Sequence, residues 1–140
     1  MKIFKILFVN FLLTENTKIS YIYLQPSIGL MNKIIHSVNL TKIYGEKETS
    51  VTALDNINVE FKENEFTAIM GPSGSGKSTL LHCLAGLDRP TSGQIFLKEE
   101  DISTLNDKQL TKIRRDSFGF VFQAFNLIPT LTAEENITLP

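Results

Sequence analysis

The chain has 140 residues and a formal net charge of −1 at pH 7, with 42% hydrophobic and 21% charged residues. This length is enough for one domain with a buried core, and the composition is that of an ordinary globular protein. A net charge so close to zero creates no strong overall field toward nucleic acid or an anionic membrane surface, so we expect no nucleic-acid partner.

Residues 1–30 differ in character from the rest of the chain. Two lysines precede an apolar run from Ile6 to Leu13, as at the front of a secretory signal, but no small-residue cleavage site follows. The run is also shorter than the roughly 20 residues that span a bilayer. Three interpretations stay open: a weak membrane-associating leader, a strand-like appendage, or a start codon assigned too early. We favour the last, because Met31 is a natural beginning, and we expect residues 1–30 to have no ordered role.

Two antiparallel strands are predicted next, at the start of a domain over residues 31–140. Alternating side chains from Ile34 to about Tyr44 are typical of a half-buried strand. A polar loop separates this strand from a second one over Val51–Phe61, which Asp55 and Asn56 are expected to bend. With the buried strand, loop and helix that follow, this order indicates an α/β fold with a small antiparallel β subdomain.

The stretch from Gly71 to Thr79 fits the pattern G-x-x-x-x-G-K-[ST] of a phosphate-binding loop. The apolar run Phe66–Met70 predicts a buried strand before it, and leucines at helical spacing predict a helix after it, which disfavours a turn without a ligand. The glycines allow successive N–H groups to turn toward an anion, and the helix adds its N-terminal dipole. Lys77 would reach the terminal phosphates of a nucleotide, and the Ser78 hydroxyl would ligate Mg²⁺. The predicted binding residues here are Gly71, Pro72, Ser73, Gly74, Ser75, Gly76, Lys77, Ser78 and Thr79.

Regular elements are predicted after a series of turn-forming residues at positions 86–93. Asn106 and Gln109 fit a capping box, as do Thr132 and Glu135, so a helix is predicted to begin at each of these places. The remaining predictions are strands over Gln94–Leu97 and Phe118–Phe122, a helix over Asn106–Asp116 and a helix starting at Ala133.

The cysteine and the histidines suggest no metal or thiol chemistry. Cys83 is the one cysteine of the chain, which excludes an intramolecular disulfide framework and favours a reducing compartment. It lies among leucines of the helix after the loop, so we expect a buried, inert thiol. His36 and His82 have no cysteine or carboxylate cluster at metal-ligand spacing.

Together these residues resemble the ATP-binding subunit of an ABC transporter, from about Met31 to Pro140. The phosphate loop is common to many nucleotide hydrolases, so its surroundings carry the resemblance. These are Tyr44 in the β subdomain, Leu54–Ile57 before the core, Leu84–Gly93 after the first helix, and Phe120–Gln123. The resemblance implies a P-loop NTPase nucleotide-binding domain with an N-terminal antiparallel β subdomain, incomplete at its C-terminus. Arg114-Arg115 followed by Phe122–Pro129 is most similar to the branch for lipoprotein release, macrolide export and antimicrobial-peptide export.

The resemblance also implies roles for residues outside the loop. Tyr44 would stack on the adenine of ATP, although a half-exposed strand tyrosine is the alternative. Gln123 would reach the Mg²⁺ ion, as Ser78 does, and the attacking water. Phe125–Pro129 would face a membrane-spanning permease subunit, with the chain at the cytoplasmic face of the cell membrane. A second ATP-binding subunit would complete a dimer in the full-length protein.

The sequence departs from the family in the residues that hydrolyse ATP. It has no LSGGQ-like signature, no apolar strand after the loop that ends in Asp followed by Glu, and no switch histidine downstream. The catalytic set is therefore incomplete, with Lys77 and Gln123 as the residues that would contribute. We expect a chain truncated before the catalytic half of an exporter ATPase; the alternatives are a nucleotide-binding fragment without hydrolytic activity and a different NTPase such as a small kinase. The resemblance also implies that the edge of strand Phe66–Met70 lacks its neighbour, so the chain is expected to be marginally stable or insoluble unless something covers that edge.

Overall fold

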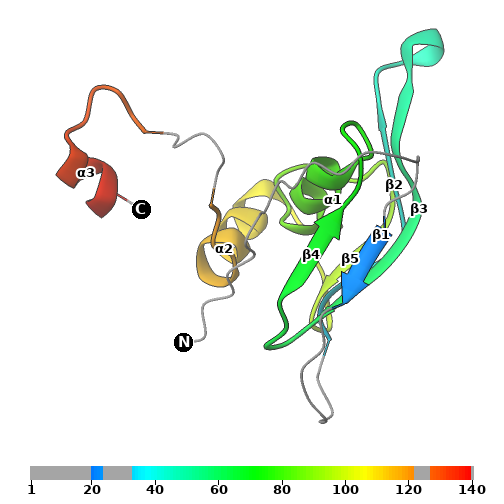
Figure 1. Ribbon diagram of the computed structural model, residues 1–140, viewed down its shortest axis with the longest axis horizontal. Helices are drawn as coiled ribbons and strands as arrows, with labels where there is room; N and C mark the ends of the chain where they lie inside the picture. The colour runs from blue at the N-terminus through cyan, green and yellow to red at the C-terminus, as the bar shows by residue number, and fades with distance from the viewer. Residues whose placement is uncertain (1–19, 24–32, 122–126, 140) are drawn as a thin grey trace.

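The computed structural model describes residues 20–23, 33–121 and 127–139. Within these ranges the chain forms two β-sheets, three α-helices and a short 3₁₀ turn (Figure 1). The elements in chain order are β1 Ser20–Tyr23, β2 Lys33–Tyr44, the 3₁₀ turn Lys47–Thr49, β3 Val51–Lys62, β4 Thr67–Met70, α1 Lys77–Leu84, β5 Ser92–Leu97, β6 Glu100–Asp101, α2 Asp107–Ser117 and α3 Ala133–Thr138.

The larger sheet is antiparallel throughout, with the strand order β3-β2-β5-β6. The β2–β3 hairpin extends past the other elements, and the 3₁₀ turn lies at its tip (Figure 1). Its register shifts between Leu40 and Lys42, opposite a stretch of β3 where Asn56 has a φ of 49°. The predicted bend at Asp55 and Asn56 is therefore confirmed as a bulge, which increases the local twist of the pair.

The hydrophobic core lies between this sheet and α1. Leu40 from β2 and Leu54 from β3 pack with Leu80 and Leu84 of α1, and each of these side chains is at most 2% exposed. The leucines of α1 recur at helical spacing, so one face of the helix is buried while the other carries polar residues. The helix after the phosphate loop is thereby fixed on the antiparallel sheet.

The smaller sheet consists of β1 and β4, which pair antiparallel from Ser20 opposite Met70 to Tyr23 opposite Thr67. The expectation that residues 1–30 have no ordered role is wrong for Ser20–Tyr23. Backbone groups of β4 need hydrogen-bond partners, and an extended segment from elsewhere in the chain can supply them without a specific turn. The expected exposed edge of β4 is thus covered on one side by the chain's own N-terminal segment.

The predicted capping boxes are confirmed at α2 and α3. The Asn106 side chain accepts from the Gln109 N–H, and the Thr132 hydroxyl accepts from the Glu135 N–H, while Gln109 and Glu135 each bond back to the cap residue. The predicted strand from Phe118 is wrong for the described residues 118–121, where the structure has a single β-bridge at Gly119 and not a continuous strand.

In the described part of the chain, every helix is too short or too polar to cross a membrane.

Candidate nucleotide-binding site

The phosphate loop joins the end of β4 to the start of α1, as the sequence predicted. Gly76 is the residue before α1, with a φ of 88° in the left-handed region. A Cβ atom at Gly76 would lie 2.5 Å from the Ala53 carbonyl oxygen of β3. Glycine is therefore required here both for the backbone dihedral and for the close approach of the loop to β3.

The Lys77 side chain folds back over the loop. Its ammonium group donates hydrogen bonds to the carbonyl oxygens of Gly71 at 2.8 Å and Pro72 at 2.7 Å, and to the Ser75 hydroxyl at 3.4 Å. The loop is thereby curled around a cation. This geometry places a positive charge on the inner side of the loop.

The N-terminus of α1 differs from those of α2 and α3. No side chain caps it, whereas capping boxes occupy the other two. The first intrahelical bond runs from the Leu80 N–H to the Gly76 carbonyl, so the N–H groups of the first turn have no helical acceptor. Ser78 lies exposed on this turn, where its hydroxyl is accessible to a metal ion. An anion at this end of α1 is favoured by these N–H groups and by the helix dipole.

Tyr44 lies at the end of β2, and 41% of its surface is exposed. Its hydroxyl donates to Oδ2 of Asp88 at 2.6 Å. This hydrogen bond raises the pKa of Tyr44, burial raises it further, and the Thr79 hydroxyl acts in the opposite direction. The influence of Thr79 shows that the tyrosine and the first turn of α1 are neighbours, although the sequence separates them by more than 30 positions.

Lys42 and Asp88 join this part of the site and were not predicted as site residues. The Lys42 ammonium group lies 2.6 Å from Oδ1 of Asp88 and 4.8 Å from the centroid of the Tyr44 ring. Burial raises the pKa of Asp88, but the hydrogen bonds from Lys42 and Tyr44 outweigh it, and the pKa lies below its ordinary value. The spacing of Lys42 and Tyr44 places both on one face of β2, which is a usable sequence signal. No local pattern connects either of them to Asp88.

Gln123 and Phe125, which the sequence predicted to contact the metal and a permease, lie outside the described residues. The structure thus brings together Tyr44, the loop and the first turn of α1.

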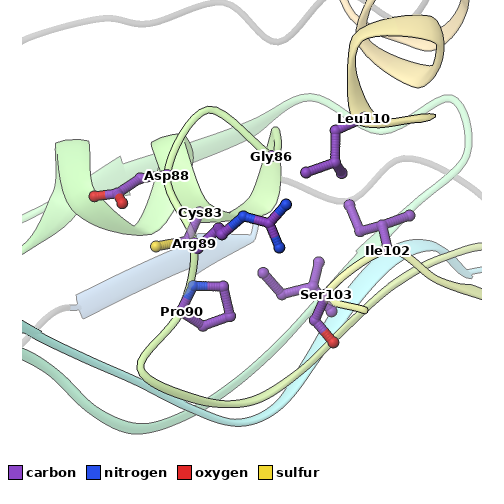
Figure 2. A pocket seen from close by; sticks show the side chains of 9 residues that line it. Cys83, Gly86, Asp88, Arg89, Pro90, Ile102, Ser103 and Leu110 are labelled. Carbon is purple, nitrogen blue, oxygen red and sulfur yellow. The ribbon is translucent and has the colours of Figure 1, made fainter. Parts of the chain in front are cut away.

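A small cavity of about 10 Å³ lies behind this site, between the C-terminal turn of α1 and the segment from β5 to α2 (Figure 2). It has room for about one water molecule. Cys83 lines it and is fully buried, and burial raises the pKa of its thiol to about 11, which fits the inert thiol expected from the sequence. The Asp88 carboxylate points away from Leu110 and Ile102 on the far side of the cavity (Figure 2). The cavity is a packing gap rather than a ligand site.

A sequence model of the ABC transporter family matches residues 54–139, which is more than half of the chain. The chain belongs to the ABC transporter family. Membership confirms the predicted resemblance and rules out the small kinase. Within the described residues, no cluster of three or more His, Cys, Asp or Glu side chains is placed to hold a metal ion.

Relatives in this family include ATP-binding proteins and an exporter. The ABC transporter ATP-binding protein MJ0796 of Methanocaldococcus jannaschii is 55% identical over 102 residues, which are 73% of this chain and 43% of that protein. The macrolide export ATP-binding/permease protein MacB of Marinobacter nauticus is 47% identical over 107 residues, which are 76% of this chain and 17% of that protein. The chain therefore spans less than half the length of these relatives.

Solved structures of ABC cassettes share the fold. A dimeric structure of MJ0796, a bacterial ABC transporter cassette, matches at 53% identity with a TM-score of 0.71 and covers 75% of this chain and 45% of that chain. A post-hydrolysis dimer of MJ0796 bound to ADP and Pi matches at 52% identity with a TM-score of 0.69 and covers 74% of this chain and 44% of that chain. The fold is accordingly that of an incomplete ATP-binding cassette.

Proposed function

We propose that the chain is the nucleotide-binding part of an ABC exporter ATPase and binds ATP with Mg²⁺ at the loop from Gly71 to Thr79. The observation that supports this proposal most directly is the position of the Lys77 ammonium group. Three oxygen atoms of the loop hold it beside an uncapped helix N-terminus. A cationic side chain and a set of unpaired N–H groups converge there, and both favour an anion with several negative oxygens.

The residues of the loop and of the first turn of α1 fit Mg²⁺-ATP. The backbone N–H groups of the loop and of α1 would hold the phosphates, Lys77 would neutralise their charge, and the exposed Ser78 hydroxyl would be a metal ligand. Bound Mg²⁺ would neutralise the phosphate oxygens further. Tyr44 would contact the adenine, because its exposed ring borders the first turn of α1. Gln123 would add a second contact to the metal and the attacking water.

We propose further that the chain of 140 residues binds ATP without turning it over. Phosphoryl transfer needs the metal held from both sides and a residue that positions the attacking water. After the loop, the sequence has no apolar strand ending in Asp-Glu and no LSGGQ-like segment. The matched segments are less than half the length of these relatives, so hydrolysis belongs to a longer protein in this proposal.

The partners follow from the same family membership. MacB is named as a joint ATP-binding and permease protein, and MJ0796 is solved as a dimer. We propose that this chain's domain likewise works with a membrane-spanning permease subunit and a second ATP-binding subunit, at the cytoplasmic face of the membrane. The exposed apolar residues Leu127 and Ile128, which follow the Gln123 segment, support a protein partner for this surface.

Equilibrium dialysis of the 140-residue chain with ATP and Mg²⁺ tests the binding proposal. We expect saturable binding that Lys77→Ala weakens about tenfold or more, because a charge-assisted contact to phosphate is removed. Lys108→Ala, which removes an exposed lysine of α2, is the matched control and should leave affinity unchanged. Equal affinity of both variants would contradict the proposal. Release of phosphate that depends on Mg²⁺ and disappears in Lys77→Ala would contradict the absence of turnover.

A further inference from the structure

Asp88 is held at a defined place by the way α1 ends. Gly86 adopts a φ of 64°, and its N–H bonds to the Cys83 carbonyl at 3.0 Å, while the Leu87 N–H bonds to the His82 carbonyl at 2.8 Å. These two bonds form a Schellman motif, which reverses the chain sharply after the helix. The Asp88 N–H also bonds to the His82 carbonyl, at 3.2 Å, so the backbone of Asp88 is fixed against the helix end.

Each oxygen of the Asp88 carboxylate accepts from a different residue of β2. Oδ1 accepts from the Lys42 ammonium group and Oδ2 from the Tyr44 hydroxyl, both at 2.6 Å. Lys42 is itself held, because its ammonium group also donates to the Arg89 carbonyl at 2.7 Å and its side chain is 13% exposed. The carboxylate therefore joins the end of α1 to the end of β2.

The Tyr44 ring is consequently restrained in two ways. Its hydroxyl is bonded to Asp88, and the Lys42 ammonium group lies over one face, 4.8 Å from the ring centroid. A tyrosine at the end of an exposed strand would otherwise rotate freely about its side-chain torsions, and ordering it on binding would cost affinity. With one face covered by the cation, the opposite face is the one available for a flat ligand.

We propose that Asp88 is a positioning residue for base recognition, which holds the Tyr44 ring in the orientation that stacks on the adenine of ATP. This inference rests on the proposed function. Asp88 acts through Tyr44 and does not touch the phosphates, so its contribution is specific to ligands that carry a base.

Comparing two ligands separates this role from a structural one. ATP carries both a base and a triphosphate, whereas inorganic tripolyphosphate carries only the phosphates. We expect Asp88→Asn to weaken Mg²⁺-ATP binding about twofold to tenfold, the cost of ordering one free side chain, and to leave tripolyphosphate binding unchanged. Asparagine replaces one of the two carboxylate oxygens with an NH₂ donor, so it cannot accept from Lys42 on one atom and from Tyr44 on the other. Asp116→Asn, a change of the same chemistry on an exposed turn of α2, is the control.

Tyr44→Phe is the second variant, since it keeps the ring, removes only an exposed hydroxyl and leaves the core untouched. We expect it to reproduce the effect of Asp88→Asn on ATP, and we expect the double variant to be no weaker than either single one. Thermal unfolding of every variant checks that the fold is retained.

Three results would overturn the inference. Equal weakening of ATP and tripolyphosphate by Asp88→Asn would assign Asp88 to the fold or the loop. A second result is ATP affinity that is unchanged in Asp88→Asn and Tyr44→Phe and falls in Tyr44→Ala. That result would show that the Tyr44 ring stacks on the base but does not need Asp88 to position it. Unchanged ATP affinity in Tyr44→Ala would show that Tyr44 does not contact the base, while binding of the phosphates by the loop would still stand. Wild-type chain that binds neither ligand would instead contradict the proposed function itself.

Discussion

The two sheets of this chain are built in different ways, although the site depends on both. In the larger sheet β2 pairs with β3 on one side and β5 on the other, and Leu40, Leu54 and Ile95 are at most 2% exposed. In the smaller sheet β4 has four residues, all half-buried, and pairs with β1 among the described strands. The larger sheet is a framework with its own core, while the smaller one is a short ribbon.

The phosphate loop therefore begins at the smaller sheet, which has fewer buried side chains than the larger one. The phosphate loop starts from β4, but α1, the helix after it, is anchored by its own leucines in the core against the larger sheet. Segments with few buried contacts open at lower free energy than the rest of a protein, and ligand-binding loops are commonly drawn from them. We therefore expect β4 and the loop to open locally while the larger sheet stays folded.

The largest expected effect lies in the framework. Leu40→Ala removes a side chain that is 0% exposed and should lower the free energy of unfolding by about 2–5 kcal/mol, because a cavity replaces buried methyl groups. Urea unfolding followed by circular dichroism measures this loss. Leu87→Ala, at a position that is 46% exposed, is the control and should cost about 1 kcal/mol or less. Equal losses would mean that the larger sheet is not the framework.

An intermediate effect is expected where the loop meets the framework. Gly76 and Gly74 have similar positive φ values of 88° and 81°, but an added Cβ meets the Ala53 carbonyl at 2.5 Å in the first case and nothing within 4 Å in the second. Gly76→Ala should therefore destabilise the fold by about 1–3 kcal/mol more than Gly74→Ala, since only Gly76→Ala adds overpacking to backbone strain. Thermal unfolding of the two variants compares them. A difference near zero would show that the loop moves away from β3 at little cost.

The smallest effect is expected in the ribbon. In an antiparallel pair, successive N–H groups point alternately toward the partner strand and away from it. Of Tyr21→Pro and Ile22→Pro, one removes a hydrogen bond to β4 and the other removes an N–H that points away, so each controls for the other. Hydrogen exchange of the β4 amides should speed up about fivefold in the disrupting variant, the equivalent of about 1 kcal/mol, with β2 and β3 unaffected. If both variants leave β4 protection unchanged, β1 does not cover that edge.

Much of the fold could be predicted because its signals are local. The capping boxes at Asn106 and Thr132 depend on residues three positions apart, and the strand–loop–helix around the phosphate loop depends on neighbouring residues. The strand expected from Phe118 is only a single bridge at Gly119 in the described residues, and where a strand pairs is not encoded in a local pattern. The same is true of β1, whose partner β4 lies more than 40 positions along the chain.

The sequence by itself determined the chemistry of the site: a glycine-rich loop with Lys77 and Ser78, on a helix whose leucines fix its buried face. Backbone freedom, charge and helical periodicity are properties of residue types and short spacings, so they can be recognised without a structure. Only the tertiary structure decided that Asp88, 44 positions from Tyr44, accepts a hydrogen bond from the Tyr44 hydroxyl and forms an ion pair with Lys42. Such contacts arise from the packing of α1 on the antiparallel sheet and the sharp turn at Gly86, and long-range packing of this kind depends on the whole core at once.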